Sequence, residues 1–143
     1  MANLTDAYET SFAKLLYQAV AIADIAENDS TTPLASIRYS LHESSPGDAG
    51  DQTSNEGNYA PYVRVSVART TTGHTVASGA ASPAATVAFA ACTSGTDTIT
   101  HFGNGTATSG AGSLIVYGTV TPNISVAAGV TPQLTTATTI TWA

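Results

Sequence analysis

Three histidines are the side chains in this sequence best suited to metal binding or to acid–base chemistry. They are His42, His74 and His101, and no cysteine or carboxylate cluster accompanies them at the spacing of metal ligands. His42 follows Ser40 in an alternating segment, and His101 is in phase with Ile99. A hydrogen-bonded structural histidine is the interpretation that we favour. The histidines therefore predict neither a catalytic site nor a metal site.

A second group of polar side chains lies in the segment 43–60, which is rich in Ser, Gly, Asp and Asn. Its Asp48, Asp51, Asn55 and Glu56 do not follow the alternate-residue spacing of a calcium loop, so a weak cation site is only an open alternative. No Gly-x-Ser-x-Gly elbow is present, and the glycines of 103–106 lack the lysine of a phosphate-binding loop. We therefore expect a protein that is not an enzyme and that uses no cofactor.

Two strongly alternating segments flank this polar loop. Apolar residues alternate with polar ones along 33–42 and again along 61–69, which predicts strands with one buried and one solvated face. On this pattern Val63, Val65 and Val67 point inward, whereas Arg38 and Arg64 point outward. A connection as long as 43–60 is uncommon in compact domains and tends to be functional or mobile.

Residues 5–27 are predicted to form an amphipathic helix. Asp6 and Glu9 resemble a capping box, and the apolar stripe, which includes Phe12, faces the core. Lys14 and Tyr17 fall on the polar side. Tyr17 is there either an anchor for a partner or a lone exposed aromatic ring.

Short strands then follow one another, separated by Gly and Pro turn signals. We expect them at 75–79, 85–90, 97–103, 113–120, 123–126 and 138–142. With the earlier pair they number about eight and are not interrupted by helices, which favours a mainly β fold. The expected architecture is a jelly-roll-like β-sandwich over 31–143 with one N-terminal helix in 1–30, packed on the sandwich or extending from it.

The composition excludes several classes of partner. Only 10% of the residues are charged, against about 25% in ordinary soluble domains, while 43% are hydrophobic. The net charge of −6 argues against nucleic acid and against anionic membranes. The N-terminus lacks the pattern of a signal peptide, so we expect synthesis and use without secretion, and the single Cys92 is expected to be a small buried residue. A surface so poor in charge suits a protein that functions in an assembly.

Several segments together resemble a family of small tailed-phage structural proteins, and the sequence is most like the jelly-roll cement proteins that decorate the capsid of a Bordetella phage. The likeness lies in the opening helix and in 39–42, 46–50, 55–56, 59–68, 98–103, 109–112 and 129–132. The resemblance implies a β-sandwich bound to the outer surface of an HK97-type capsid, synthesised in the host cytoplasm. It further implies a symmetric homodimer that contacts the major capsid protein and bridges neighbouring capsomers.

The expected contact regions are the helix and the 43–60 loop with its flanking strands. The candidate interface residues are Tyr17, Lys14, Arg38, Asp48, Asp51, Tyr59, Tyr62 and Arg64. The alternative function is a tail-associated or fibre-tip module that binds a host receptor, for which Tyr59 and Tyr62 beside the acidic loop could hold a glycan. An enzyme is the third class, and we find no catalytic triad or metal site that would support it.

Overall fold

The computed structural model describes residues 6–22 and 34–141, and the chain divides into two compact units. The first unit comprises the described parts of Met1–Ser36, Val67–Thr86 and Leu134–Ala143. The second comprises Ile37–Ser66 and Val87–Gln133. The predicted boundary at residue 30 lies outside the described residues and stays a prediction.

Over the residues that the structure describes, the fold is mainly β with a single N-terminal helix, as predicted. Over the described residues there are nine strands, one more than the approximate number expected. The elements are α1 (Asp6–Gln18), β1 (Ser36–His42), β2 (Val65–Ala68), β3 (His74–Ala77), β4 (Ala80–Pro83), β5 (Val87–Ala88), β6 (Asp97–Gly105), β7 (Leu114–Val126), β8 (Gln133–Leu134) and β9 (Ile140–Thr141). β4 occupies a segment in which we expected a turn, and β8 was not expected.

The strands form several antiparallel sheets, consistent with the predicted sandwich. A four-stranded sheet has the order β2-β1-β6-β7, a three-stranded sheet the order β3-β4-β9, and β5 pairs with β8. β1 and β6 are therefore the central strands of the largest sheet, and β2 and β7 are its edges.

β1 supplies much of the core of the second unit. Ile37, Tyr39 and Leu41 are fully buried, as the alternation predicted. Ser40 and His42 are also fully buried, so the prediction of a solvated opposite face is wrong at this end of the strand. The reason is that the 43–64 segment folds back over the end of β1, where His42 pairs in an isolated bridge with Glu56.

The helix was predicted over 5–27, but in the structure it ends at Gln18. Ala19 adopts a left-handed φ of 55°, and the N–H of Val20 donates to the carbonyl of Lys14 at 3.2 Å. The Arg69 guanidinium then donates to the carbonyls of Leu15 and Leu16 at 2.6 Å each. A positive charge near the C-terminal carbonyls of a helix interacts favourably with the helix dipole. Residues 23–27 of the predicted helix lie outside the described residues.

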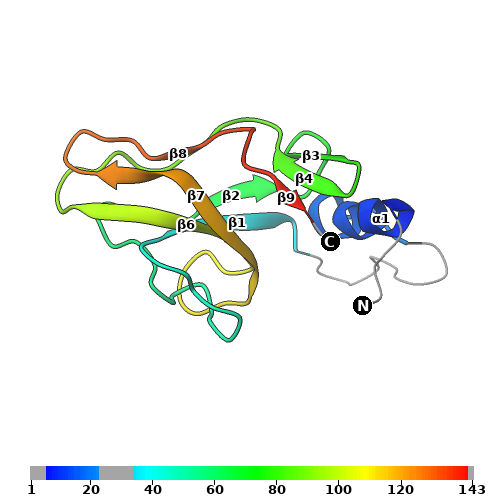
Figure 1. The fold of residues 1–143 in the computed structure, drawn as a ribbon, viewed down its shortest axis with the longest axis horizontal. Helices are drawn as coiled ribbons and strands as arrows, with labels where there is room; N and C mark the ends of the chain where they lie inside the picture. The colour runs from blue at the N-terminus through cyan, green and yellow to red at the C-terminus, as the bar shows by residue number, and fades with distance from the viewer. Residues whose placement is uncertain (1–5, 23–33, 142–143) are drawn as a thin grey trace. The chain divides into compact units, whose positions relative to one another are not determined.

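The face that α1 buries differs from the predicted one. α1 packs on β3 and β4 of its own unit (Figure 1), and Ala13 and Tyr17 are fully buried there. Phe12, expected in the core, is 45% exposed. Small Ala13, one turn before Tyr17, lets the helix approach closely, and the Tyr17 ring meets the His74 ring at a centroid distance of 4.9 Å. Tyr17 is therefore a core residue.

β7 runs without interruption through Thr121-Pro122, where two separate strands were expected. Its register with β6 shifts between the pairs His101–Thr119 and Ile99–Ile124, so residues 120–123 bulge out of the pairing. An edge strand tolerates a proline at such a bulge because the missing N–H costs no ladder hydrogen bond. The predicted break between two strands is therefore wrong: the strand continues through Thr121-Pro122, and the irregularity takes the form of a bulge.

Candidate functional site

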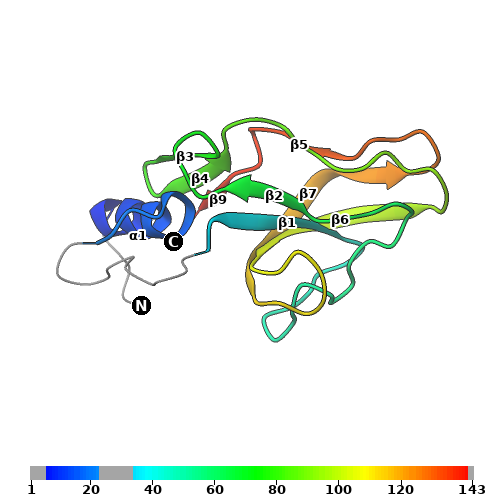
Figure 2. The ribbon, with the colours of Figure 1, turned by 180° about the vertical axis from the view of Figure 1, so that it is seen from behind.

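The 43–64 segment is held firmly against the loop that joins β6 to β7, and Gln52 is the main link between them. Figures 1 and 2 both show the two loops side by side at one end of β6. The Gln52 side chain is fully buried, accepts the N–H of Ala107 at 2.8 Å and donates to its carbonyl at 3.4 Å. A Cβ on Gly105 or Gly112 would lie 2.1 or 2.3 Å from this side chain, so both positions require glycine.

A buried ion pair fixes the far end of the same segment. The Arg64 guanidinium binds both carboxylate oxygens of Glu56 at 2.6 Å, and a third nitrogen donates to the carbonyl of Ala107 at 3.1 Å. The hydroxyl of Tyr62 also donates to Glu56, at 2.9 Å. The hydrogen bonds to Glu56 raise the pKa of Arg64 above its ordinary value. Bidentate pairing of this kind fixes geometry as well as charge.

This ion pair explains why the predicted orientation of the 61–69 segment is wrong. Arg64 is only 8% exposed, although it was expected in solvent, and Val63 is 61% exposed, although it was expected in the core. The regular strand begins only at Val65, so alternation does not govern residues 61–64. In this segment the paired Arg64 side chain is buried, and Val63 is left exposed.

His42 is a structural residue in the floor of this loop. Its Nδ1 lies 2.9 Å from the carbonyl of Ser54, and its Nε2 lies 2.8 Å from the hydroxyl of Ser40. A carbonyl can only accept, so Nδ1 carries the proton and Ser40 donates to Nε2. Burial lowers the pKa of His42, which keeps the ring neutral. Nδ1 thus holds the loop, and Nε2 fixes the ring to Ser40 of β1.

Asp97, at the start of β6, anchors the remainder of the loop. It is 7% exposed, and one of its oxygens accepts the backbone N–H groups of Asn58 and Tyr59 at 2.8 and 3.0 Å. Tyr59 is buried, and its hydroxyl donates to the carbonyl of Ala90 at 3.0 Å. Burial raises the pKa of Tyr59 to about 12. The loop is consequently a rigid platform with a buried underside.

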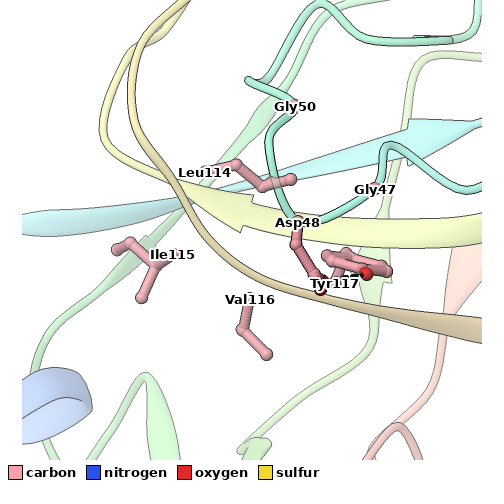
Figure 3. Close-up of a pocket in the computed structure, with 7 residues that line it drawn as sticks. All are labelled: Gly47, Asp48, Gly50, Leu114, Ile115, Val116 and Tyr117. Carbon is pink, nitrogen blue, oxygen red and sulfur yellow. Dashed lines mark hydrogen bonds between the residues drawn. The ribbon is translucent and has the colours of Figure 1, made fainter.

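A surface groove of about 340 Å³ lies between this platform and the first half of β7. The hydroxyl of Tyr117 donates to Asp48 at 2.6 Å, and Figure 3 shows the two side chains reaching toward each other. This hydrogen bond raises the pKa of Tyr117. The groove is lined by Gly47, Asp48, Gly50, Leu114, Ile115, Val116 and Tyr117. A carboxylate and a phenol beside aliphatic side chains suit the binding of a polar, uncharged ligand with an apolar face.

A second, mainly polar depression of about 480 Å³ lies beside the start of β6. It is lined by Glu43, Thr96, Asp97, Thr98, Ser125, Val126 and Ala127. A hydrogen bond with Asp97 raises the pKa of Glu43 above its ordinary value. Since Asp97 already holds the loop backbone, this depression is a weaker candidate than the groove.

The structure places the eight predicted interface residues in different environments. Tyr17, Tyr59 and Arg64 are buried and do not reach the surface. Arg38 bonds to Ser66, and Asp51 accepts the N–H and hydroxyl of Thr53 at 2.8 and 2.6 Å. Lys14, Arg38, Asp51 and Tyr62 are half-buried, and Asp48 is exposed and lines the groove.

Sequence reasoning missed Gln52, Asp97 and Tyr117. Nothing in the local pattern marks Gln52 or Asp97, because their partners are distant in sequence. Gln52 bonds to Ala107, 55 positions away, and Asp97 bonds to Asn58 and Tyr59, 39 and 38 positions away. Tyr117 could have been found, since an aromatic residue in the alternation of 113–120 must point to one defined side of its strand.

The described ranges contain no group of three or more His, Cys, Asp or Glu side chains arranged to hold a metal ion. Cys92 is buried, as predicted, and its thiol lies 3.4 Å from the carbonyl of Ser94. Within the part of the chain that the structure describes, no helix has the length and apolar character needed to cross a membrane.

Comparison with known proteins gives one family assignment. A family model described as Podophage GP4 fiber I protein gp80 matches residues 14–141. No curated protein matches the sequence. The match supports the predicted resemblance to phage structural proteins and does not specify a capsid cement protein.

Proposed function

The chain belongs to the family of podophage GP4 fiber I protein gp80, a phage structural protein family, and we propose that it serves in the fibre as a module that recognises the host surface. It acts by binding, in several copies, without turning over a substrate. The observation that carries this proposal is the family match, which extends from residue 14 to residue 141.

The groove supplies the contact for this function. Asp48 is exposed, and with one oxygen engaged by Tyr117 its carboxylate is held at a fixed orientation. The Asp48 carboxylate and the Tyr117 oxygen, whose proton is donated to Asp48, can accept hydrogen bonds from sugar hydroxyls. Ile115, 36% exposed, offers an apolar surface for the face of a sugar ring. We therefore infer that the ligand is an uncharged glycan of the host surface.

The loop network supports recognition because it holds the groove in shape before the ligand arrives. Gln52 and the Glu56–Arg64 pair connect the loop that carries Asp48 to the segment that leads into β7. Side chains that are already ordered lose little conformational entropy on binding, which preserves affinity. If one copy binds weakly, several copies that bind together reach a higher overall affinity.

Decoration of the capsid is the second candidate, and the low charged fraction favours it. With 10% charged residues, the surface suits close packing of many identical copies. In that function the partner is the major capsid protein and the site is the outer capsid surface. The sequence resemblance to cement proteins also supports it.

Locating and counting the protein in purified particles tests both functions. A fibre component is expected in tens of copies or fewer at the fibres, seen by particle imaging and by quantitative gel staining. Hundreds of copies over the shell would reject the fibre function and favour decoration.

Competition for adsorption then tests recognition itself. We expect the purified chain to reduce phage adsorption to host cells, and Asp48→Ala to weaken this competition by about tenfold. Ser109→Ala, an exposed change outside the groove lining, serves as the matched control. Equal competition by wild type and Asp48→Ala would contradict the groove as the contact.

A further inference from the structure

Asn104 and Gly105 form the only asparagine–glycine pair in the sequence. Asparagine is a chemically labile residue, and it deamidates most readily before glycine. The reason is that glycine has no side chain to hinder the approach of its backbone nitrogen to the asparagine side chain. Every other asparagine of the chain precedes a residue with a side chain. The sequence therefore places its most labile amide at position 104.

The fold requires both residues of this pair. A Cβ on Gly105 would lie 2.1 Å from the side chain of Gln52, which is fully buried. Asn104 is also fully buried, and its side chain interacts with that of Tyr39. Packing thus fixes the labile pair on β6, a central strand of the largest sheet.

Strand pairing on both sides keeps the pair unreactive in the folded protein. Asn104 pairs with Tyr39 of β1 and with Val116 of β7, and Gly105 pairs with residues of the same two strands. Deamidation needs the Gly105 nitrogen to turn toward the Asn104 side chain, and the extended backbone of a paired strand holds it away. Burial of both residues also excludes the water that the reaction consumes. The folded chain therefore protects its own labile amide.

We propose that Asn104-Gly105 is a deamidation site that the fold closes and unfolding opens. In the unfolded chain the Gly105 nitrogen attacks the side-chain carbonyl carbon of Asn104 and forms a bond to it. The bond from that carbon to the amide nitrogen breaks, and ammonia leaves with the Gly105 proton. Water then opens the cyclic imide at either carbonyl, which leaves an aspartate or an isoaspartate. Water is the only co-reactant, and nothing is oxidised or reduced.

Either product opposes the return to the fold. An aspartate at this position carries a charge into surroundings where burial already raises the pKa of Tyr39 to about 12, and an unpaired buried charge is costly. An isoaspartate lengthens the backbone of β6 by a methylene group, which disrupts its pairing with β1 and β7.

Chemical change of the unfolded chain makes unfolding irreversible, so the working life of the protein depends on how rarely it unfolds. A phage structural protein is not replaced after the particle has assembled, and this protection is therefore relevant to it. The inference goes beyond the proposed function and applies equally to a fibre component and to a shell component.

Incubation of the full chain in a series of urea concentrations at mildly alkaline pH tests the proposal. Peptide mapping by mass spectrometry measures amide-to-acid conversion at each asparagine, and circular dichroism measures the unfolded fraction. Conversion of Asn104 should be roughly tenfold faster or more in unfolded than in folded protein, and its rate should follow the unfolded fraction. Asn58 and Asn123 are internal controls: both are exposed but precede Tyr59 and Ile124, so they should convert slowly in both states.

Two variants separate the reaction from its consequence. Gly105→Ile, compared with the wild type in urea because the fold has no room for the side chain, should slow conversion of Asn104 to the rate of Asn123. Asn104→Asp, which carries the aspartate product from the start, should give much less folded protein than the wild type. After dilution of partly converted wild type from urea, the folded fraction isolated by size-exclusion chromatography should contain only intact Asn104.

Three results would each overturn the proposal: conversion of Asn104 that is as fast in folded as in unfolded protein, conversion in urea no faster than that of Asn123, or converted chains that refold like intact ones. Because these tests use purified protein without host cells or particles, their failure is distinguishable from failure of the fibre function.

Discussion

Gln52 and Ala107 are joined through both ends of one side-chain amide: the Gln52 oxygen accepts the Ala107 N–H at 2.8 Å, and the Gln52 nitrogen donates to the Ala107 carbonyl at 3.4 Å. The same carbonyl accepts a guanidinium nitrogen of Arg64 at 3.1 Å. One backbone position on the β6–β7 loop thus receives two side chains of the 43–64 segment. This link joins the two loops that lead into the segments lining the groove.

Gln52→Ala should destabilise the second unit by about 2–3 kcal/mol, because it leaves a backbone donor without its acceptor and opens a cavity. Urea unfolding followed by circular dichroism measures the loss. Ser109→Ala, at an exposed position in the neighbouring loop, should change the free energy of unfolding by less than about 0.5 kcal/mol. Equal stability of Gln52→Ala and wild type would show that the Gln52 side chain is not needed to hold the two loops together.

Arg64→Met should cost about 3 kcal/mol, because it leaves the Glu56 carboxylate largely buried without a counter-charge. The side chains of Arg64 and Glu56 are only 2% and 16% exposed. A double-mutant cycle with Glu56→Gln isolates the pair, and the double variant should be more stable than the sum of the single losses predicts. Strictly additive losses would mean that the two side chains do not interact.

Tyr17→Ala should unfold or strongly destabilise the first unit, by about 3–5 kcal/mol, since the ring is fully buried against His74. Thermal unfolding monitored by circular dichroism measures it. Phe12→Ala removes a neighbouring aromatic ring that is 45% exposed, and its cost should be clearly smaller. A larger loss of stability for Phe12→Ala than for Tyr17→Ala would support the helix orientation predicted from the sequence.

The stability of the fold should decrease as pH falls below about 6.5. Burial lowers the pKa of both His42 and His74 from the ordinary value of 6.5. Between the folded and unfolded pKa values the unfolded chain binds more protons, so protonation favours unfolding, and stability is complete only above pH 6.5. The slope should not exceed about 1.4 kcal/mol per pH unit for each histidine.

Urea unfolding between pH 5 and 8 measures this dependence, and NMR titration should show midpoints below 6.5 for both rings. Stability that rises on acidification through this range would contradict the assignment of neutral, buried histidines.

The features that depend on residues near one another in sequence were predictable. Alternation predicted β1 and β6, the N-terminal apolar pattern predicted a helix, and the absence of further helical patterns predicted a mainly β fold. The sequence marked an irregularity at Thr121-Pro122, but it predicted two separate strands where the structure has one strand with a bulge.

The sequence alone determined the secondary structure in outline, because side-chain periodicity and turn residues act over a few positions. Only the tertiary structure decided which faces are buried. Tyr17 became core because His74 lies beside it, and Arg64 became buried because Glu56 supplies a counter-charge. The groove likewise needed Asp48 and Tyr117, 69 positions apart, to meet. Such pairings are set by the packing of the whole chain, and no local pattern of residues encodes them.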